Sequence, residues 1–377
     1  MKRVLIAANF IGFFHFLWDD IDILNSMGYK VYAIADNGTN ETHTIEILKE
    51  KNVTFIESCI DGKIPLTKNN LVYYKKVKRL LERYHFDLIH CHTPIVGLLV
   101  RLAVRKYRKF GTKVIYTTHG LAYTHLSSRK EYLIYHTIES IASRFCDAII
   151  TINFEDYDNA RKLHCKYVYH INGVGVNIRK YENVEIDKWK YREQLGITND
   201  KIMILSIGEL STRKNHIVIV DAISMLKDKD KYVYAICGRR MTGNGTGELI
   251  RKEAAKKGVN VVFLGFRSDI PQIVHCADIG AIPSLREGLG LSGIETLSAG
   301  VPMIGSDVQG IREYIINGKT GFLCNPHDSA GFAKAIDILS DSHYRSSLKQ
   351  NCLDAVKKFD KSISIQQRRK IYMEILA

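Results

Sequence analysis

Short runs of apolar and β-branched residues alternate with helical patterns along almost the whole chain, and this alternation restricts the possible folds more than any other feature. In the first half, the runs occupy residues 2–10, 30–36, 53–58, 86–92, 113–120, 148–153 and 167–173. Segments with helical periodicity, such as 18–28 and 71–85, lie between them. Strands that alternate with helices form parallel sheets covered on both faces. The first half is therefore predicted to be a doubly wound α/β domain.

The alternation lapses at residues 176–200, a charged stretch without a strand-like run, and then resumes. The second series of strand-like runs comprises residues 201–210, 232–238, 259–266, 279–284 and 301–307. At 377 residues, the chain is also too long for one ordinary hydrophobic core. We therefore predict two Rossmann-like parallel-sheet domains, residues 1–177 and 178–360, that face each other across a cleft. Residues 361–377 are predicted to form a C-terminal helix that could pack back on the first domain.

Cysteine usage and hydropathy exclude several classes of protein. The 8 cysteines are scattered and contain no C-x-x-C pair, which argues against a zinc site or a disulfide framework and is typical of a reducing cytoplasm. The N-terminus begins like a secretory signal, but Asn9 and His15 interrupt its apolar run, so we interpret residues 1–10 as a buried strand. No run approaches the ~18 apolar residues that a membrane span requires. The protein is expected in the cytoplasm, either soluble or peripheral at the inner face of the cell membrane.

The formal net charge of +14 is concentrated in the first half of the chain, where residues 1–180 contain 26 Lys and Arg against 17 Asp and Glu. Segments 73–84 and 101–113 contribute much of this excess. They are either solvated helical faces or a surface that attracts anionic lipid headgroups. No zinc finger or other recognition motif accompanies the charge, so nucleic acid is not expected as a partner.

The segment 284–302, SLREGLGLSGIETLSAGVP, places two acids around an uncharged glycine-rich stretch. It predicts a tight turn after a strand and then a short helix whose first amides, near Gly290 and Leu291, would attract a diphosphate. Glu287 would lie at the mouth of this helix and Glu295 about one turn inside, and carboxylates accept hydrogen bonds from paired sugar hydroxyls. The pattern suits a sugar nucleotide. It equally suits an ordinary helix with one acid at its start and one solvated glutamate.

Polar residues at the ends of other strands add further candidates, because ligands bind at the carboxyl ends of parallel strands. Arg213 and Lys214 follow the first strand of the second series and could reach a phosphate, although a surface basic pair would look the same. His119 ends a strand of the first domain, where it could position a sugar hydroxyl or have a purely structural role.

No metal site is predicted. HCH at 90–92 puts two imidazoles on one face of a strand, but the sequence gives no third ligand nearby. The tripeptides DID at 20–22 and DKD at 228–230 could be taken for metal–nucleotide ligands, but each lies in a helical pattern.

Taken together, these segments resemble the family 4 retaining glycosyltransferases of the GT-B fold over almost the whole chain. The segment PSLREGLGLSGIETLSAGVPMI is similar to the long motif with two glutamates that marks this family, and the likeness continues through SDVQGIREYI. Further similar segments are FDLIHCHTP, VIYTTHG, TINFEDY, INGVGVN and LGFRSDI. Together with GEL and KNH at 208–216, they look most like enzymes of capsule and exopolysaccharide assembly.

The resemblance implies a role for each candidate residue. In the second domain, Glu287 would contact the hydroxyls of the donor sugar and Glu295 would hold the ribose. The diphosphate would meet the amides near Gly290 and Leu291 together with Lys214 and Arg213. The remaining implied positions are Arg267 near the base, Gly12 in a loop near the phosphates, and His119 facing the sugar at the reaction centre.

The chain also departs from the family pattern. Glu209 stands where many relatives have an arginine beside the phosphates, so Lys214 and Arg213 must contribute more of the positive charge. The next glycine-rich turn, CGRRMTG, leaves Arg239 or Arg240 as substitutes. The N-terminal loop has FIGFFH and lacks a double glycine.

The implied reaction is transfer of a hexosyl group from a nucleoside diphosphate sugar, here a UDP-sugar, with retention of anomeric configuration. A polyprenyl-diphosphate-linked saccharide is the implied acceptor. No metal or other cofactor is expected, because the helix terminus and Lys214 would neutralise the leaving group. Two alternatives stay open: a UDP-sugar epimerase of the same fold, and a non-catalytic protein that binds a sugar nucleotide.

Overall fold

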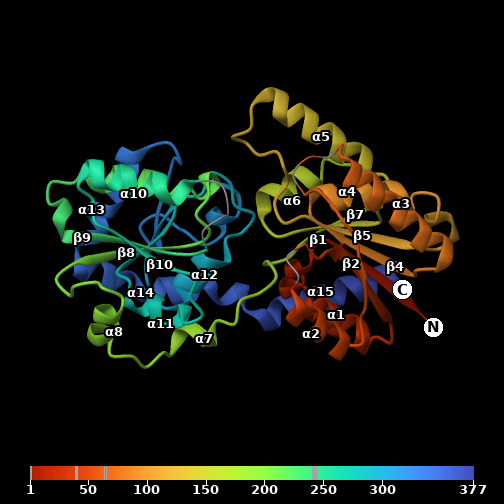
Figure 1. The fold of residues 1–377 in the computed structure, drawn as a ribbon, viewed down its shortest axis with the longest axis horizontal. Helices are drawn as coiled ribbons and strands as arrows, with labels where there is room; N and C mark the ends of the chain where they lie inside the picture. The colour runs from red at the N-terminus through yellow and green to blue at the C-terminus, as the bar shows by residue number, and fades with distance from the viewer. Residues whose placement is uncertain (1, 39–40, 63, 65, 240–244) are drawn as a thin grey trace. The chain divides into compact units, whose positions relative to one another are not determined.

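The computed structural model describes residues 2–38, 41–62, 64, 66–239 and 245–377, and the chain divides into two compact units (Figure 1). Unit 1 comprises Met1–Gly175 and Ser362–Ala377, and unit 2 comprises Val176–Lys361. The division between the units therefore falls at 175/176, where the sequence analysis places it at 177/178, and the C-terminal helix α15 (Lys361–Leu376) packs within unit 1.

The core of unit 1 is a seven-stranded parallel sheet with the strand order β3-β2-β1-β4-β5-β6-β7. Each strand-like run predicted before residue 175 forms one of these strands. They are β1 (Arg3–Phe10), β2 (Lys30–Asp36), β3 (Thr54–Glu57), β4 (Leu88–His92), β5 (Lys113–Thr117), β6 (Ala148–Thr151) and β7 (Tyr167–His170). Because all the pairs are parallel, the carboxyl ends of the strands lie along one edge of the sheet, where ligands bind in such folds.

Helices cover both faces of this sheet (Figure 1). On one face lie α1 (Trp18–Ser26), α2 (Thr42–Glu50) and α15, and on the other lie α3 (Lys68–Arg83), α4 (Pro94–Val104), α5 (Arg129–Ser143) and α6 (Phe154–Ala160). Short 3-10 turns are η1 (Ile11–Phe16) and η2 (Arg108–Phe110). Capping determines where the longer helices begin: the Thr67 side chain accepts from the Asn70 amide, and Ser128 and Glu131 form a capping box.

Unit 2 is built on a six-stranded parallel sheet with the order β10-β9-β8-β11-β12-β13. The predicted strands are β8 (Ile202–Ile207), β9 (Tyr232–Cys237), β10 (Val261–Gly265), β11 (Ile279–Ile282) and β12 (Met303–Ser306). The sixth strand, β13 (Gly321–Cys324), was not predicted. Its four residues, GFLC, follow a polar turn and are too short to show a period, so its pairing with β12 decides its structure.

The helical elements of unit 2 surround its sheet. The α-helices are α7 (Arg179–Glu182), α8 (Lys188–Gln194), α9 (Ile217–Ser224), α10 (Thr246–Lys257), α11 (Ile270–Cys276), α12 (Leu291–Ser298), α13 (Ser329–Ser340) and α14 (Ser342–Val356). The 3-10 turns are η3 (Thr212–Lys214), η4 (Lys229–Lys231), η5 (Gln309–Glu313) and η6 (Lys357–Phe359). In the part of the chain that the structure describes, no helix has the length and apolar character needed to cross a membrane.

A buried ion pair connects the charged stretch at the start of unit 2 to the sheet of that unit. Asp278, next to β11, accepts from Arg192 Nη2 of α8 at 2.5 Å and from the Met203 amide of β8 at 2.8 Å. Lys188 Nζ lies 3.3 Å from its other oxygen. Burial alone would raise the pKa of Asp278, but the charges of Lys188 and Arg192 hold it below its usual value.

Replacing Asp278 with asparagine should therefore destabilise unit 2. The change leaves the buried Arg192 guanidinium without its counter-charge, and losses of this kind are about 3–5 kcal/mol. Urea unfolding measures the difference in free energy. Asp200→Asn is the matched control, because Asp200 pairs with Lys201 at the surface and such pairs contribute about 0–1 kcal/mol. Equal losses in the two variants would contradict the anchoring role.

Candidate functional site

The predicted turn and short helix of residues 284–302 are present in unit 2. After β11, the chain turns at Gly290, which has a positive φ of 78°, and α12 begins at Leu291. A Cβ at Gly290 would come within 2.9 Å of both the Glu287 side chain and the Tyr314 hydroxyl, so only glycine fits. The Leu291 and Ser292 amides have no acceptor within α12, whereas the Gly293 amide donates to Gly290 O at 2.9 Å. Unpaired amides at the start of a helix form an anion site.

Glu287 lies at the start of this turn and contacts two other predicted site residues, Lys214 and Arg213. Its Oε2 accepts from Lys214 Nζ at 2.6 Å, from Arg213 Nη1 at 3.2 Å and from Ser284 Oγ at 3.2 Å. Desolvation would raise the pKa of Glu287, but Lys214 and Arg213 outweigh it and lower that pKa below its usual value. Glu287 is therefore an ionised, half-buried carboxylate that can accept sugar hydroxyls.

Glu209, which replaces an expected arginine, belongs to the same cluster. Its Oε1 lies 3.1 Å from Arg213 Nη2 and accepts from Ser211 Oγ at 2.9 Å. Arg213 thus bridges Glu209 and Glu287, and Lys214 contributes the second cation. Two cations and two carboxylates balance in formal charge, so the amides of α12 add the positive potential that favours a phosphate here.

Glu295 lies one turn inside α12 and has a separate environment. It is half-buried, and desolvation raises the pKa of its carboxyl group. Tyr181 of α7 lies beside it and interacts with the carboxyl group. Tyr181 was not predicted, because it is one of three aromatic residues in the charged stretch 176–200 and nothing in that stretch indicates contact with α12.

Arg267 lines a cavity of about 300 Å³ at the carboxyl ends of β8, β9 and β10. The lining residues are Ile207, Gly208, Glu209, Cys237, Gly238, Arg239, Phe266, Arg267 and Ile270. The Arg267 guanidinium is held by Asp269, with Nε 2.8 Å from Oδ1, and Asp269 also accepts from the Tyr191 hydroxyl. Gly208 links this cavity to the charged cluster around Glu287, because the Lys214 side chain packs against Gly208. A Cβ at Gly208 would lie 3.1 Å from Lys214 Cε.

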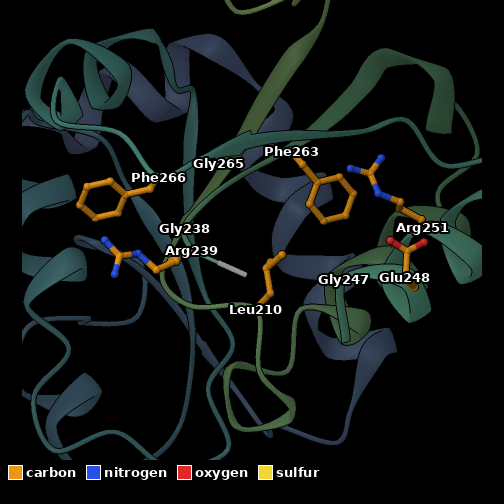
Figure 2. A pocket seen from close by; sticks show the side chains of 9 residues that line it. All are labelled: Leu210, Gly238, Arg239, Gly247, Glu248, Arg251, Phe263, Gly265 and Phe266. Atoms are coloured by element: carbon orange, nitrogen blue, oxygen red, sulfur yellow. The ribbon is translucent and has the colours of Figure 1, made fainter. Parts of the chain in front are cut away.

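A second cavity of about 290 Å³ adjoins the first and shares Gly238, Arg239 and Phe266 with it (Figure 2). Figure 2 shows the Arg239 guanidinium beside the Phe266 ring, and the two are 4.7 Å apart. Arg239 was one of two proposed substitutes for the phosphate-binding arginine. Arg239 forms a cation–π pair with Phe266 at the rim of both cavities, and Arg240 lies outside the described residues.

In unit 1, His119 follows β5 and contacts His92 at the end of β4. His119 Nε2 lies 3.2 Å from His92 Nδ1, and the Phe13 ring packs edge-on against His119 at 4.8 Å between centroids. No third ligand was predicted near the two histidines at 90 and 92, but the pairing of β4 with β5 brings the imidazole of His119 beside them. Burial lowers the pKa of His119 to about 4, so its ring is neutral at pH 7.

Gly12 lies in η1, buried against an acid. A Cβ there would come within 2.9 Å of the Glu41 carboxylate and 3.1 Å of the Phe10 ring. A carboxylate so close reduces the attraction of this loop for a phosphate, and nothing in the sequence around Glu41 indicated the contact.

Among the described residues, no group of three or more His, Cys, Asp or Glu is placed to hold a metal ion. The tripeptide at 20–22 is part of α1, where Asp20 binds Arg368 and Asp22 binds Lys51.

Comparisons with known proteins agree with this architecture. The chain matches the family model described as Glycosyltransferase Family 4 over residues 22–174 and the one described as Glycosyl transferases group 1 over residues 187–354. It is 33% identical over 350 residues to EpsD of Bacillus subtilis (strain 168), which is named only as a proposed glycosyltransferase; the match covers 90% of this chain and 87% of that protein.

Two further relatives are similar over most of their length. The UDP-Gal:alpha-D-GlcNAc-diphosphoundecaprenol alpha-1,3-galactosyltransferase of Escherichia coli is 26% identical over 324 residues, covering 79% of this chain and 81% of the relative. Anabaena Alr3699/HepE, solved in complex with UDP and glucose, superposes with a TM-score of 0.79 at 20% identity and covers 99% of this chain and 100% of its own.

Two doubly wound parallel-sheet units, with this likeness to solved structures, define the GT-B fold. The chain belongs to the family 4 glycosyltransferases. Both the predicted fold and the predicted family are therefore confirmed.

The buried histidines should make the stability of the protein depend on pH. Burial lowers the pKa of His90 to about 4 from an unfolded value of 6.5, so as the pH falls the unfolded chain binds the proton first. Stability from this group is complete above pH ~6.5 and is lost toward pH 4, by about 3 kcal/mol. Urea unfolding across this range measures the loss. His90→Gln should flatten the curve, whereas the exposed His343→Gln should not; parallel curves for all three proteins would contradict the assignment.

Proposed function

We propose that the chain transfers a hexosyl group from a UDP-sugar to a lipid-linked saccharide, with retention of configuration. The observation that carries this proposal is the ionised Glu287, which is held by Lys214 and Arg213 at the mouth of α12. A carboxylate beside cations and helix amides suits a sugar diphosphate. The sugar hydroxyls would bind Glu287, and the phosphates would bind the α12 amides and Lys214.

The reaction separates charge along the donor. The bond between the anomeric carbon and the diphosphate breaks, and its electron pair stays on the phosphate oxygen. The acceptor hydroxyl attacks the anomeric carbon from the side that the diphosphate leaves, and its proton passes to the departing oxygen. Lys214 and the α12 amides would stabilise the growing negative charge, and Glu287 would stabilise the positive sugar ring. No metal or further cofactor is required by this scheme.

Roles for the other residues follow from their surroundings. The cavity beside Gly208 and Arg267 would take the uracil, and Glu295 would bind the ribose, sharing its carboxylate with Tyr181. Two relatives support a uridine nucleotide: the Escherichia coli enzyme is named for UDP-Gal, and the Anabaena protein was solved with UDP.

Lys214→Met should abolish most transfer without unfolding the protein. Removing one preorganised donor to a leaving group typically lowers kcat by about 10²–10³-fold. Radiolabelled UDP-sugar transfer measures kcat, and the thermal midpoint monitors folding. Lys257→Met is the matched control, because it also removes a lysine salt bridge in unit 2 but lies at the end of α10. Unchanged transfer in Lys214→Met would contradict the proposed role of Lys214. Formation of an epimer from the donor alone would favour an epimerase.

The acceptor is proposed to be anchored in a membrane, and the exposed face of α5 supports this. Leu133 and Ile134 are 66% and 47% exposed, and Ile141 lies two turns further along the same helix. Arg129 and Lys130 are exposed at the start of α5, and Figure 1 shows this helix extending from the helical layer of unit 1. An apolar strip beside cations matches an anionic bilayer surface. This surface supports the proposal that the enzyme is peripheral at a membrane, and we propose the cytoplasmic face.

Leu133→Glu combined with Ile134→Glu should weaken binding to vesicles that contain phosphatidylglycerol by at least about tenfold, because burying each side chain gains about 1.5–3 kcal/mol. Cosedimentation at low salt measures the affinity, and binding should fall as salt is added. Ile338→Glu is the control, since Ile338 is an exposed apolar residue of α13 in unit 2. Equal vesicle binding by the double variant and the wild type would remove α5 as the membrane-binding surface.

A further inference from the structure

Three imidazoles form a continuous array at the carboxyl ends of β4 and β5 in unit 1. His90 and His92 lie on the same face of β4, with ring centroids 4.1 Å apart, and the ring of His119 lies 5.4 Å from that of His92. His90 and His92 are each 1% exposed, whereas His119 is partly exposed. The array thus leads from the interior of unit 1 to a surface-accessible ring.

The proton positions at the inner end of the array follow from its hydrogen bonds. Tyr372 of α15 donates its single hydroxyl proton to Asp20 Oδ1 at 2.7 Å, while Arg368 occupies Asp20 Oδ2 at 2.5 Å. The Tyr372 oxygen lies 2.7 Å from His90 Nδ1 and must accept there, so His90 carries its proton on Nδ1. His90 Nε2 then accepts from Thr117 Oγ1 at 2.7 Å. Every member of this inner network has a defined donor and acceptor.

The proton of His92 is constrained by burial. Its Nε2 is buried and has no hydrogen-bond partner among the described residues, and its Nδ1 faces His119. A proton on Nε2 would leave a buried N–H without an acceptor, which costs about 1–3 kcal/mol. An unpaired acceptor is tolerated more readily than an unpaired donor. The proton therefore belongs on Nδ1, from which His92 donates to His119 Nε2 across 3.2 Å.

This direction determines what His119 offers to a ligand. We propose that His92 is a positioning residue that holds His119 as the neutral tautomer with its proton on Nδ1, so that His119 presents an N–H donor to the substrate of the transferase. His119 Nε2 is occupied as an acceptor from His92. The ring then binds an oxygen of the substrate and does not act as a general base through Nε2.

The identity of the substrate rests on the proposed function, whereas the tautomer of His119 does not. A fixed N–H at the outer end of the array would accept neither the acceptor's proton nor a metal. It would hydrogen-bond a sugar hydroxyl or a phosphate oxygen, and these remain the classes of ligand that the geometry allows.

Long-range ¹H–¹⁵N correlation spectra of the full-length protein labelled at histidine test the tautomer directly. His119→Gln identifies the His119 signals. In the wild type, the pattern of a ring protonated at Nδ1 is expected for His119. In His92→Leu that tautomer should lose its dominance, and in His92→Asn it should be kept, because the asparagine amide can replace the Nδ1–H donor. A wild-type His119 protonated at Nε2 would overturn the inference.

Kinetics with the same variants separate positioning from general disruption. His92→Leu should lower kcat for transfer by about tenfold, the equivalent of one hydrogen bond, and His92→Asn should restore most of it. Cys91→Ala is the control for packing, because Cys91 points to the opposite face of β4 and should leave the His119 spectrum unchanged. Equal kcat and equal spectra in the leucine and asparagine variants would also overturn the inference.

Failure of the proposed function gives a different result. If the protein transfers no sugar but its His119 spectrum responds to His92 as described, the positioning role stands and the transferase assignment fails. If sugar is transferred and the spectrum does not respond, the transferase assignment stands and the positioning role fails.

Discussion

Parallel strand pairing is the constraint on which both units depend. Consecutive strands of a parallel sheet are joined by crossovers, so every strand of a unit ends at the same edge of the sheet. In unit 2 this brings Lys214, after β8, to Glu287, after β11, although the two are far apart in the sequence. In unit 1 the same geometry places His119 against His92. The candidate residues of each unit meet because its sheet is parallel.

In the charged cluster of unit 2, formed by Glu209, Arg213, Lys214 and Glu287, positive and negative charges are equal in number. Arg213 and Lys214 are paired with Glu209 and Glu287, which lowers the cost of holding four charges in a partly buried site. A diphosphate entering this site would share cations that already have partners, so the fixed amides of α12 gain importance. Glu209 thus contributes a negative charge beside Arg213, at a position where the family resemblance had implied an arginine.

Long regular patterns made the fold and the α12 turn predictable, whereas tertiary contacts did not leave a signal. Each strand-like run that was singled out became a strand, because the apolar runs of parallel sheets are continuous and bounded by turns. The four residues of β13 lacked such a pattern. The contacts of Tyr181 with Glu295 and of Glu41 with Gly12 join residues from separate elements, and a single sequence does not record such pairings. The sequence predicted that His90 and His92 lie on one face of a strand, but it did not predict that His119 lies beside them.

The position of α15 in the chain has a consequence for biosynthesis. This helix is made after all of unit 2, yet its Arg368 and Tyr372 bind Asp20 and His90 inside unit 1. During translation, unit 1 must therefore keep these buried groups unpaired until α15 has been synthesised. A chain that stops before α15 would contain all of unit 2 and every predicted site residue, but its first domain would lack part of its interior. Helix α15 thus makes completion of the first domain depend on synthesis of the second.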